Sequence, residues 1–270
     1  MELFFDKHSE FAGAPVVGVP LSGALTNRVY KFQWQGRDYL YRLLADEVAG
    51  FHDRHRERTV TMALRAYGIM PKIQEWPVGA SYQVWHFAEG GVVDRPSFMK
   101  EGWLPLLRQL HQVEVDGIGV FEPFAAIEAH LPNIKGEWQG RCQAVYDHLK
   151  ASSQIPLLME AEPRVLAHLD LWPGNILKSS DGIMYLLDFE YSQMAPRFCE
   201  FAHITAHMGW GRQELSRFIG VYFKCQSPGE EARVLAYLPV AKLYWLVWCL
   251  VALSGSDRQS WAEFYYRGLG

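Results

Sequence analysis

The sequence predicts an α+β fold with two lobes, a small β-rich lobe followed by a larger helical one. In the first third of the 270-residue chain, apolar and polar residues alternate, which is typical of half-buried strands. Beyond Pro96 the apolar residues recur at helical spacing, and the chain after Pro196 has the pattern of helices throughout. We therefore expect residues 1–90 to form the first lobe and residues 91–270 to form the second.

Composition limits the classes of function. The chain is 49% hydrophobic and 14% aromatic, which supports a sizeable core, and its net charge of −4 gives no electrostatic footprint for a nucleic acid. The four cysteines lack metal-binding spacing, so we expect reduced thiols in the cytoplasm. The apolar run at 243–253 has about half of the roughly 20 residues that a membrane span needs. The sequence carries no signal for an oligomeric state.

Three elements are predicted in the first lobe. Residues 29–34 and 39–43 alternate around a "QGRD" turn and predict a β-hairpin. Residues 51–67 predict a helix that stops at "YGIMP". Residues 82–87, "YQVWHF", predict another strand that ends at "AEGG".

The second lobe is predicted to be mainly helical. Residues 97–113 and 137–152 have helical patterns, and the first of them repeats apolar residues at Trp103, Leu107, Leu110 and Val113. Two short apolar strands are predicted within "RVLAHLDL" (164–171) and "MYLLDFE" (184–190). The polar loop between these strands is the most informative stretch of the chain.

That loop, "HLDLWPGNIL", combines side chains suited to phosphoryl transfer. Asp170 and Asn175 have the spacing H-x-D-x-x-x-x-N, and Asp188 with Glu190 follows in "DFE". An aspartate accepts the proton of an attacking hydroxyl, and amide and carboxylate oxygens suit Mg²⁺. We therefore expect Asp170 to be the catalytic base, with His168 bracing the loop. Asn175, Asp188 and Glu190 are the candidate metal ligands. Two neighbouring acidic residues are usually just charged side chains in contact with solvent. The H-x-D-x-x-x-x-N motif followed by "DFE" within twenty residues is rare by chance.

Two stretches resemble a known family. "AHLDLWPGNIL" and "YLLDFEYSQMAPRFCEFA" resemble the catalytic and metal motifs of the aminoglycoside phosphotransferase and choline kinase superfamily. "LSGALTNRVYKF" is similar to the nucleotide loop of bacterial choline kinases and thiamine kinases. The resemblance implies a protein-kinase-like two-lobed fold with ATP and Mg²⁺ as cofactors, and a small-molecule alcohol as the partner.

The resemblance also assigns nucleotide-binding residues. Arg42 in "YLYRL" would hold phosphates and be oriented by Glu57, since a guanidinium is permanently charged and can donate two parallel hydrogen bonds to one acceptor group. Ser22, Thr26 and Asn27 would donate hydrogen bonds to phosphate, although ordinary turn chemistry explains these residues equally well. The connection "WHFA" would meet the adenine through Trp85 and Phe87.

The chain departs from the pattern of protein kinases. Its nucleotide loop has one glycine, Gly23, which is followed by Ala24, and Glu190 stands where protein kinases have the glycine of DFG. Trp172 is bulky where the family often has a polar residue. No activation segment follows, so a protein substrate is not expected.

Aromatic residues guide the choice of substrate. Trp245, Trp248 and Trp261, with Trp172 from the loop, are candidates for a wall around a cation, although an aromatic stripe at helical spacing is more often core. We expect choline, ethanolamine or thiamine as the acceptor, and an aminoglycoside or sugar is the alternative. An aminoglycoside site needs clustered carboxylates, and the available Glu200, Glu230, Glu231 and Glu263 show no clear clustering, so the more aromatic than acidic tail favours a substrate with a single cation.

Two other classes of protein could contain these acidic residues. A pseudokinase or binding module predicts the loss of a base or metal residue, yet Asp170, Asn175 and Asp188 are all present. A metal-dependent α+β hydrolase would use the same acids but leaves "LTNRVYKF" and "YLYRL" unexplained.

Overall fold

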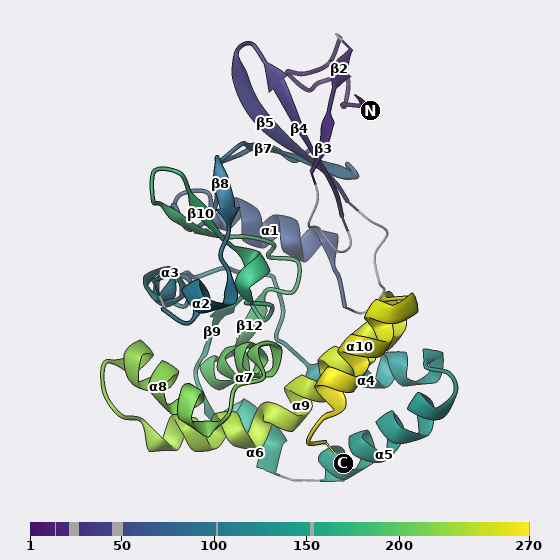
Figure 1. The fold of residues 1–270 in the computed structure, drawn as a ribbon, viewed down its shortest axis with the longest axis vertical. Coiled ribbons are helices and arrows are strands. Elements are labelled where there is room, and N and C mark those ends of the chain that lie inside the picture. Colours follow the sequence, from purple (N-terminus) through teal and green to yellow (C-terminus); the bar gives the residue numbers. More distant parts are fainter. Residues whose placement is uncertain (14, 22–26, 45–50, 101, 152–153, 270) are drawn as a thin grey trace.

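The computed structural model describes residues 1–13, 15–21, 27–44, 51–100, 102–151 and 154–269. Figure 1 shows a β-rich part at the top, which contains the N-terminus, above a larger helical part. The predicted α+β, kinase-like class is therefore confirmed. The strands of the upper part are β1 (Glu2–Leu3), β2 (Val16–Val17), β3 (Val19–Leu21), β4 (Arg28–Trp34), β5 (Arg37–Leu43), β6 (Ile73–Glu75) and β7 (Tyr82–His86).

The upper sheet is antiparallel in the order β3-β4-β5-β7-β6. The predicted hairpin is β4 and β5, whose pairing continues to Trp34 opposite Arg37. Gln35 and Gly36 form its two-residue loop with positive φ angles of 47° and 77°, which match the twist of the strands. This register places Arg42 opposite Val29 on one side and Gln83 on the other.

Helix α1 (Arg54–Leu64) is shorter than the predicted 51–67, because Asp53 caps its first turn by accepting a hydrogen bond from the Arg56 N–H. Its buried face contains Val60 and Leu64, but also Glu57. The amphipathic pattern that buries α1 therefore also carries a carboxylate into the interior.

The helical part contains one long core helix. Its helices are α2 (Arg95–Phe98), α3 (Leu104–Leu110), α4 (Pro123–His130), α5 (Glu137–Ala151), α6 (Gln154–Ala161), α7 (Arg197–Met208), α8 (Arg212–Phe223), α9 (Pro228–Ala252) and α10 (Gly255–Tyr266). The predicted helix at 97–113 is thus two short helices. Helix α9 is long and apolar enough to cross a membrane by length and composition, with a mean hydropathy of 1.8, but 67% of that window is buried inside the protein. Such burial matches the core helix of a globular domain.

Two small sheets hold the loop singled out in the sequence. Strand β9 (Arg164–Ala167) pairs with β12 (Gln193–Pro196), and β10 (Ile176–Ser179) pairs with β11 (Met184–Leu186) and β8 (Gly90–Val92). The expectation that Asp188 and Glu190 lie in an extended strand is wrong. Strand β11 ends at Leu186, and Asp188 has a left-handed φ of 64°, so the chain turns there.

Strand β8 joins the sheet of the helical part directly after the connection that leaves the upper sheet (Figure 1). The boundary between the two lobes at residue 90 remains a prediction.

Gly90 has a φ of 148°, and a Cβ added there would collide with the backbone of Lys178 and Ser179. Only glycine suits this close approach of β8 to β10.

We expect Gly90→Ala to lower the free energy of unfolding by roughly 1–3 kcal/mol, because the new methyl group forces β8 away from β10 in a backbone region reserved for glycine. Denaturant unfolding measures the change. Gly91→Ala is the matched control, since a Cβ there meets nothing within 4 Å. Equal losses in both variants would show that β8 tolerates displacement.

Candidate active site

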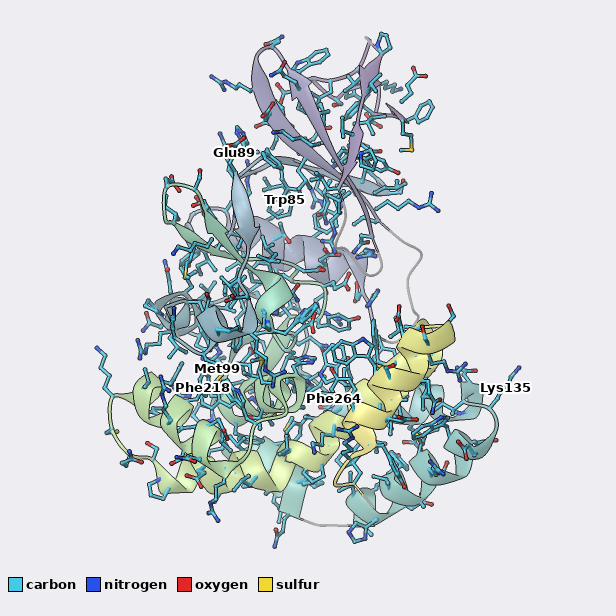
Figure 2. The ribbon with its side chains drawn as sticks, in the orientation of Figure 1. Trp85, Glu89, Met99, Lys135, Phe218 and Phe264 are labelled. Atoms are coloured by element: carbon cyan, nitrogen blue, oxygen red, sulfur yellow. The ribbon has the colours of Figure 1, made fainter. Side chains whose placement is uncertain are left out.

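A cavity of about 540 Å³ lies where the upper sheet meets the helical part, and Figure 2 shows Trp85 at this junction. One side is formed by β4, β5 and the connection after β7. The other is formed by the loop at 170–175, the segment after β11, and helices α7, α9 and α10. Every predicted site residue that the structure describes lines this cavity except His168 and Glu57, which lie directly behind it.

The catalytic loop is held by its own polar side chains. The Asn175 amide donates to the backbone oxygen and to Oδ2 of Asp170, both at 2.8 Å. His168 Nε2 lies 2.8 Å from the carbonyl oxygen of Leu187, and its Nδ1 lies 3.3 Å from the Asp170 N–H. With Nε2 as donor and Nδ1 as acceptor, a neutral His168 satisfies both contacts. This geometry supports the predicted bracing role of His168.

Glu200 anchors the same loop from α7. Its carboxylate has no exposed surface and accepts hydrogen bonds from the backbone N–H groups of His168 and Leu169. Leu169 has a left-handed φ of 65°, a conformation that costs energy in a residue with a Cβ. Glu200 is therefore not available to a cationic substrate, because its carboxylate holds the loop.

Burial dominates the electrostatics of Asp170. Burial raises the pKa of Asp170 to about 8, and the negative charges of Asp188 and Glu200 add to the rise, whereas the neighbouring His168 and the hydrogen bond from Asn175 oppose it. A carboxylate with a raised pKa is a stronger proton acceptor when ionised. The loop thus presents a carboxylate matched to proton transfer near neutral pH.

Arg42 is the centre of a buried ionic cluster. Its Nη1 lies 3.0 Å from Glu57 Oε1, and its Nη2 lies 2.6 Å from Asp188 Oδ1 and 3.3 Å from Glu190 Oε2. Arg54 adds a second cation, with Nη1 2.7 Å from Glu57 and 3.2 Å from Glu190. Burial alone would lower the pKa of Arg42, but the three carboxylates outweigh it and raise the pKa. The predicted Arg42–Glu57 pair is present.

The donor atoms of this cluster fit a hard cation. Carboxylate oxygens of Glu57, Asp188 and Glu190 lie within 4.8 Å of one another, and oxygen is the ligand that Mg²⁺ prefers. Asn175 lines the same cavity as Asp188 and Glu190. With its amide nitrogen bound to Asp170, the amide oxygen is the atom left for a metal. The metal roles of Asn175, Asp188 and Glu190 remain predictions.

The nucleotide-binding candidates fall into two groups. Asn27, Trp85 and Phe87 line the cavity, and the Trp85 indole donates to Gln83 Oε1 at 2.9 Å. Ser22 and Thr26 lie outside the described residues. The connection "WHFA" borders the cavity over its whole length, 85–88, as an adenine contact would require.

All four candidate tryptophans line the cavity. Trp245 and Trp248, on α9, have ring centroids 5.7 Å apart, and Trp261 on α10 stacks on Tyr265. Trp172 belongs to the catalytic loop and packs over Gly174. By contrast, Glu230 pairs with Arg233 on α9, Glu231 pairs with Arg212 on α8, and Glu263 accepts a hydrogen bond from Gln259. Neither these three acids nor Glu200 lines the cavity.

Sequence reasoning missed His207, which lines the cavity, and His52, which lies behind Glu190. His207 Nε2 lies 3.2 Å from Asp170 Oδ1, and His207 Nδ1 lies 2.7 Å from the Tyr265 hydroxyl. His52 Nε2 approaches Glu190 at 3.5 Å, and burial lowers the pKa of His52 to about 4, so this imidazole is neutral. The spacing of His203 and His207, i and i+4 on one predicted helix, was the one available signal.

Comparison with known proteins agrees with this geometry. The chain is 24% identical over 273 residues to a probable choline kinase 1 of Arabidopsis thaliana, with 87% of this chain and 79% of the relative covered. Its fold is similar to choline kinase LicA from Streptococcus pneumoniae, with a TM-score of 0.80, 21% identity, and 94% and 93% of the two chains covered. LicA is also known in complex with AMP.

A thermostable mutant of aminoglycoside phosphotransferase APH(4)-Ia, in ternary complex with AMP-PNP and hygromycin B, is similar with a TM-score of 0.66 and 19% identity. The two chains are covered to 95% and 94%. Residues 17–237 match the phosphotransferase enzyme family, APH. The match spans most of the chain and includes both the Arg42 cluster and the catalytic loop. The chain belongs to this family and is a phosphotransferase with an alcohol group as acceptor.

Proposed function

We propose that the protein transfers the γ-phosphoryl group of ATP to the hydroxyl group of a small alcohol that carries a quaternary nitrogen, with choline or thiamine as the preferred acceptor. The observation that carries this proposal is the lining of the cavity. Asp170 lines the same cavity as Arg42 and as Trp245, Trp248 and Trp261, and its neighbour His207 packs against Trp245. The guanidinium suits phosphates, and the indoles suit a desolvated cation.

The reaction needs positioning and charge stabilisation. ATP binds between the sheet and the helices, with its adenine at residues 85–88 and its phosphates at Arg42. The acceptor oxygen attacks the γ-phosphorus, its proton moves to Asp170, and the bond to the β-phosphate oxygen breaks to release ADP. Asp188, Glu190 and Asn175 would hold Mg²⁺, which when bound neutralises phosphate charge. Arg42 exchanges its contact with Asp188 for phosphate oxygens, and Glu57 keeps the guanidinium in place.

The charges around the cavity favour one cation over many. Among the described lining residues, the acids are Asp170, Asp188 and Glu190, and all three belong to the catalytic machinery. In the part of the lining that the structure describes, a polycationic aminoglycoside would find no further carboxylate. A primary ammonium, as in ethanolamine, also needs hydrogen-bond acceptors, whereas a quaternary nitrogen needs only aromatic faces. Choline and thiamine therefore rank ahead of ethanolamine.

We also infer a cytoplasmic location. All four cysteines are free, and Cys142, Cys199 and Cys249 are buried without forming disulfides. Free thiols and the use of ATP both suit a reducing compartment.

The direct test is release of ADP by the purified protein with choline, thiamine, ethanolamine, a hexose and an aminoglycoside, each with Mg·ATP. We expect the highest kcat/KM with choline or thiamine. Turnover only with the sugar or the aminoglycoside would contradict the proposed acceptor. If the protein binds nucleotide but turns over none of these acceptors, the result would favour a binding module.

Asp170→Asn should lower kcat by a factor on the order of 10² or more, because the amide cannot accept the hydroxyl proton, while the Kd for ATP changes little. Steady-state kinetics and nucleotide titration measure the two effects. Asp147→Asn, an exposed site on α5, is the control. A purified Asp170→Asn enzyme with wild-type turnover would remove Asp170 from the base role.

Asp188→Ala should abolish the Mg²⁺-dependent part of nucleotide binding, because a hard cation loses a carboxylate ligand. Binding of ATP is titrated with and without Mg²⁺, and circular dichroism checks the fold. Arg42 keeps Glu57 and Glu190 as partners, so we expect the variant to fold. Unchanged affinity for Mg·ATP in a folded variant would place the metal elsewhere.

Trp261→Leu should raise the KM for choline up to about thirtyfold, the equivalent of about 2 kcal/mol of cation–π attraction, since leucine keeps apolar bulk but lacks the indole face. The KM for a neutral alcohol should change less. Trp34→Leu is the control, because Trp34 is similarly half-buried but lies in the upper sheet. An equal rise for charged and neutral acceptors would contradict recognition of the cation by Trp261.

A further inference from the structure

His207 is a polar side chain that lines the cavity and has no part in the proposed reaction. It lies on α7 and is 6% exposed, and its Nε2 is 3.2 Å from Oδ1 of Asp170. The other carboxylate oxygen, Oδ2, is the one that accepts from Asn175 at 2.8 Å. The two oxygens of the candidate base therefore face donors from two separate elements of the fold.

The imidazole ring is fixed on its other side. Nδ1 lies 2.7 Å from the hydroxyl of Tyr265 on α10, and the ring packs against Trp245 with centroids 4.6 Å apart. Trp245 is itself held by a hydrogen bond from its indole N–H to His203 Nδ1, 2.7 Å long. By contrast, Nε2 makes no aligned hydrogen bond with any residue that the structure describes. A buried ring nitrogen in that state is costly, and Asp170 Oδ1 is within reach of it.

While Asp170 is ionised, as it must be before it can accept a proton, only one tautomer of a neutral imidazole is compatible with this arrangement. An ionised carboxylate accepts hydrogen bonds and cannot donate them, so Nε2 must carry the proton that points towards Asp170. Nδ1 is then an acceptor, and the Tyr265 hydroxyl must donate to it. The opposite tautomer would place a nitrogen lone pair against the carboxylate oxygen.

We propose, on the basis of the proposed function, that His207 is a positioning residue, whose Nε2–H holds Oδ1 of Asp170 while Tyr265 selects the tautomer. Asn175 and His207 then fix the carboxylate from both ends. Since a carboxylate has about four lone-pair sites, two remain free to receive the hydroxyl proton of the acceptor.

The imidazole does not take that proton itself. Burial lowers the pKa of His207 to about 3, so the ring stays neutral and the transferred proton remains on Asp170. Tyr265 also stacks on Trp261, with ring centroids 5.8 Å apart and planes at 21°. Contacts therefore run from Trp261 through Tyr265 and His207 to the candidate base, Asp170.

A spectroscopic test does not depend on knowing the acceptor. In protein labelled with ¹⁵N-histidine and held at a pH above the Asp170 pKa of about 8, we expect the His207 signal to show the Nε2–H tautomer, and His207→Gln identifies that signal by its loss. Asp170→Asn and Tyr265→Phe should each shift it, whereas Tyr266→Phe should not, since Tyr266 packs against Trp138 away from His207. An Nδ1–H tautomer in the wild type would overturn the proposal.

A kinetic test separates positioning from packing. His207→Phe keeps a ring against Trp245 but removes the donor, and kcat should fall roughly tenfold to hundredfold, as misplaced catalytic groups do, with the KM for ATP nearly unchanged. His207→Gln retains an N–H donor near Nε2 and should recover part of the loss. Equal kcat for wild type and His207→Phe, or equal losses in both variants, would overturn the proposal. If no alcohol is turned over by the wild type, the proposed function fails, while the ¹⁵N signal still decides the hydrogen bond.

Discussion

The site depends on one buried guanidinium. Arg42 reaches from strand β5 to Glu57 on α1 and to Asp188 and Glu190 in the helical part, so one side chain ties together three segments that are distant in sequence. Its side chain is 11% exposed, and those of Glu57 and Glu190 are 2% and 4% exposed. Removing one partner from such a buried pair typically costs about 3–5 kcal/mol, because it leaves a charge uncompensated. The cluster therefore constrains how the sheet meets the helices as well as what the site can bind.

The cluster also explains how three carboxylates can lie so close together before a ligand arrives. Like charges within 4.8 Å repel strongly in a largely buried site, and here Arg42 and Arg54 offset that repulsion. If Mg·ATP binds as proposed, the cation would lie against Asp188 and Glu190, and phosphate oxygens would replace Asp188 as partners of Arg42. The carboxylates and the guanidinium would then each keep an opposite charge beside them.

Local patterns in the sequence predicted the hairpin, helix α1 and the residues of the catalytic loop, because alternation, capping and the H-x-D-x-x-x-x-N spacing act over a few neighbouring residues. Other features depend on tertiary structure. Strand β10 has no strong alternation and exists because β8 and β11 lie on either side of it. Glu200 looked like any acid in a helix, yet it holds backbone N–H groups 31 and 32 residues away. The turn at Asp188 was also hidden, since a left-handed aspartate has no distinctive sequence context.

The tryptophans show why burial alone does not separate core from binding site. Trp245 and Trp248 are 3% and 7% exposed, as expected for core residues, yet both border the cavity. Trp245 satisfies its indole N–H through His203 and packs against His207, so its edge belongs to the core while the same ring supports the neighbour of the base. An aromatic stripe at helical spacing can thus pack in the core and border a cavity at the same time. The proposed recognition of a cation depends on the second of these positions, because the same cavity is lined by Asp170.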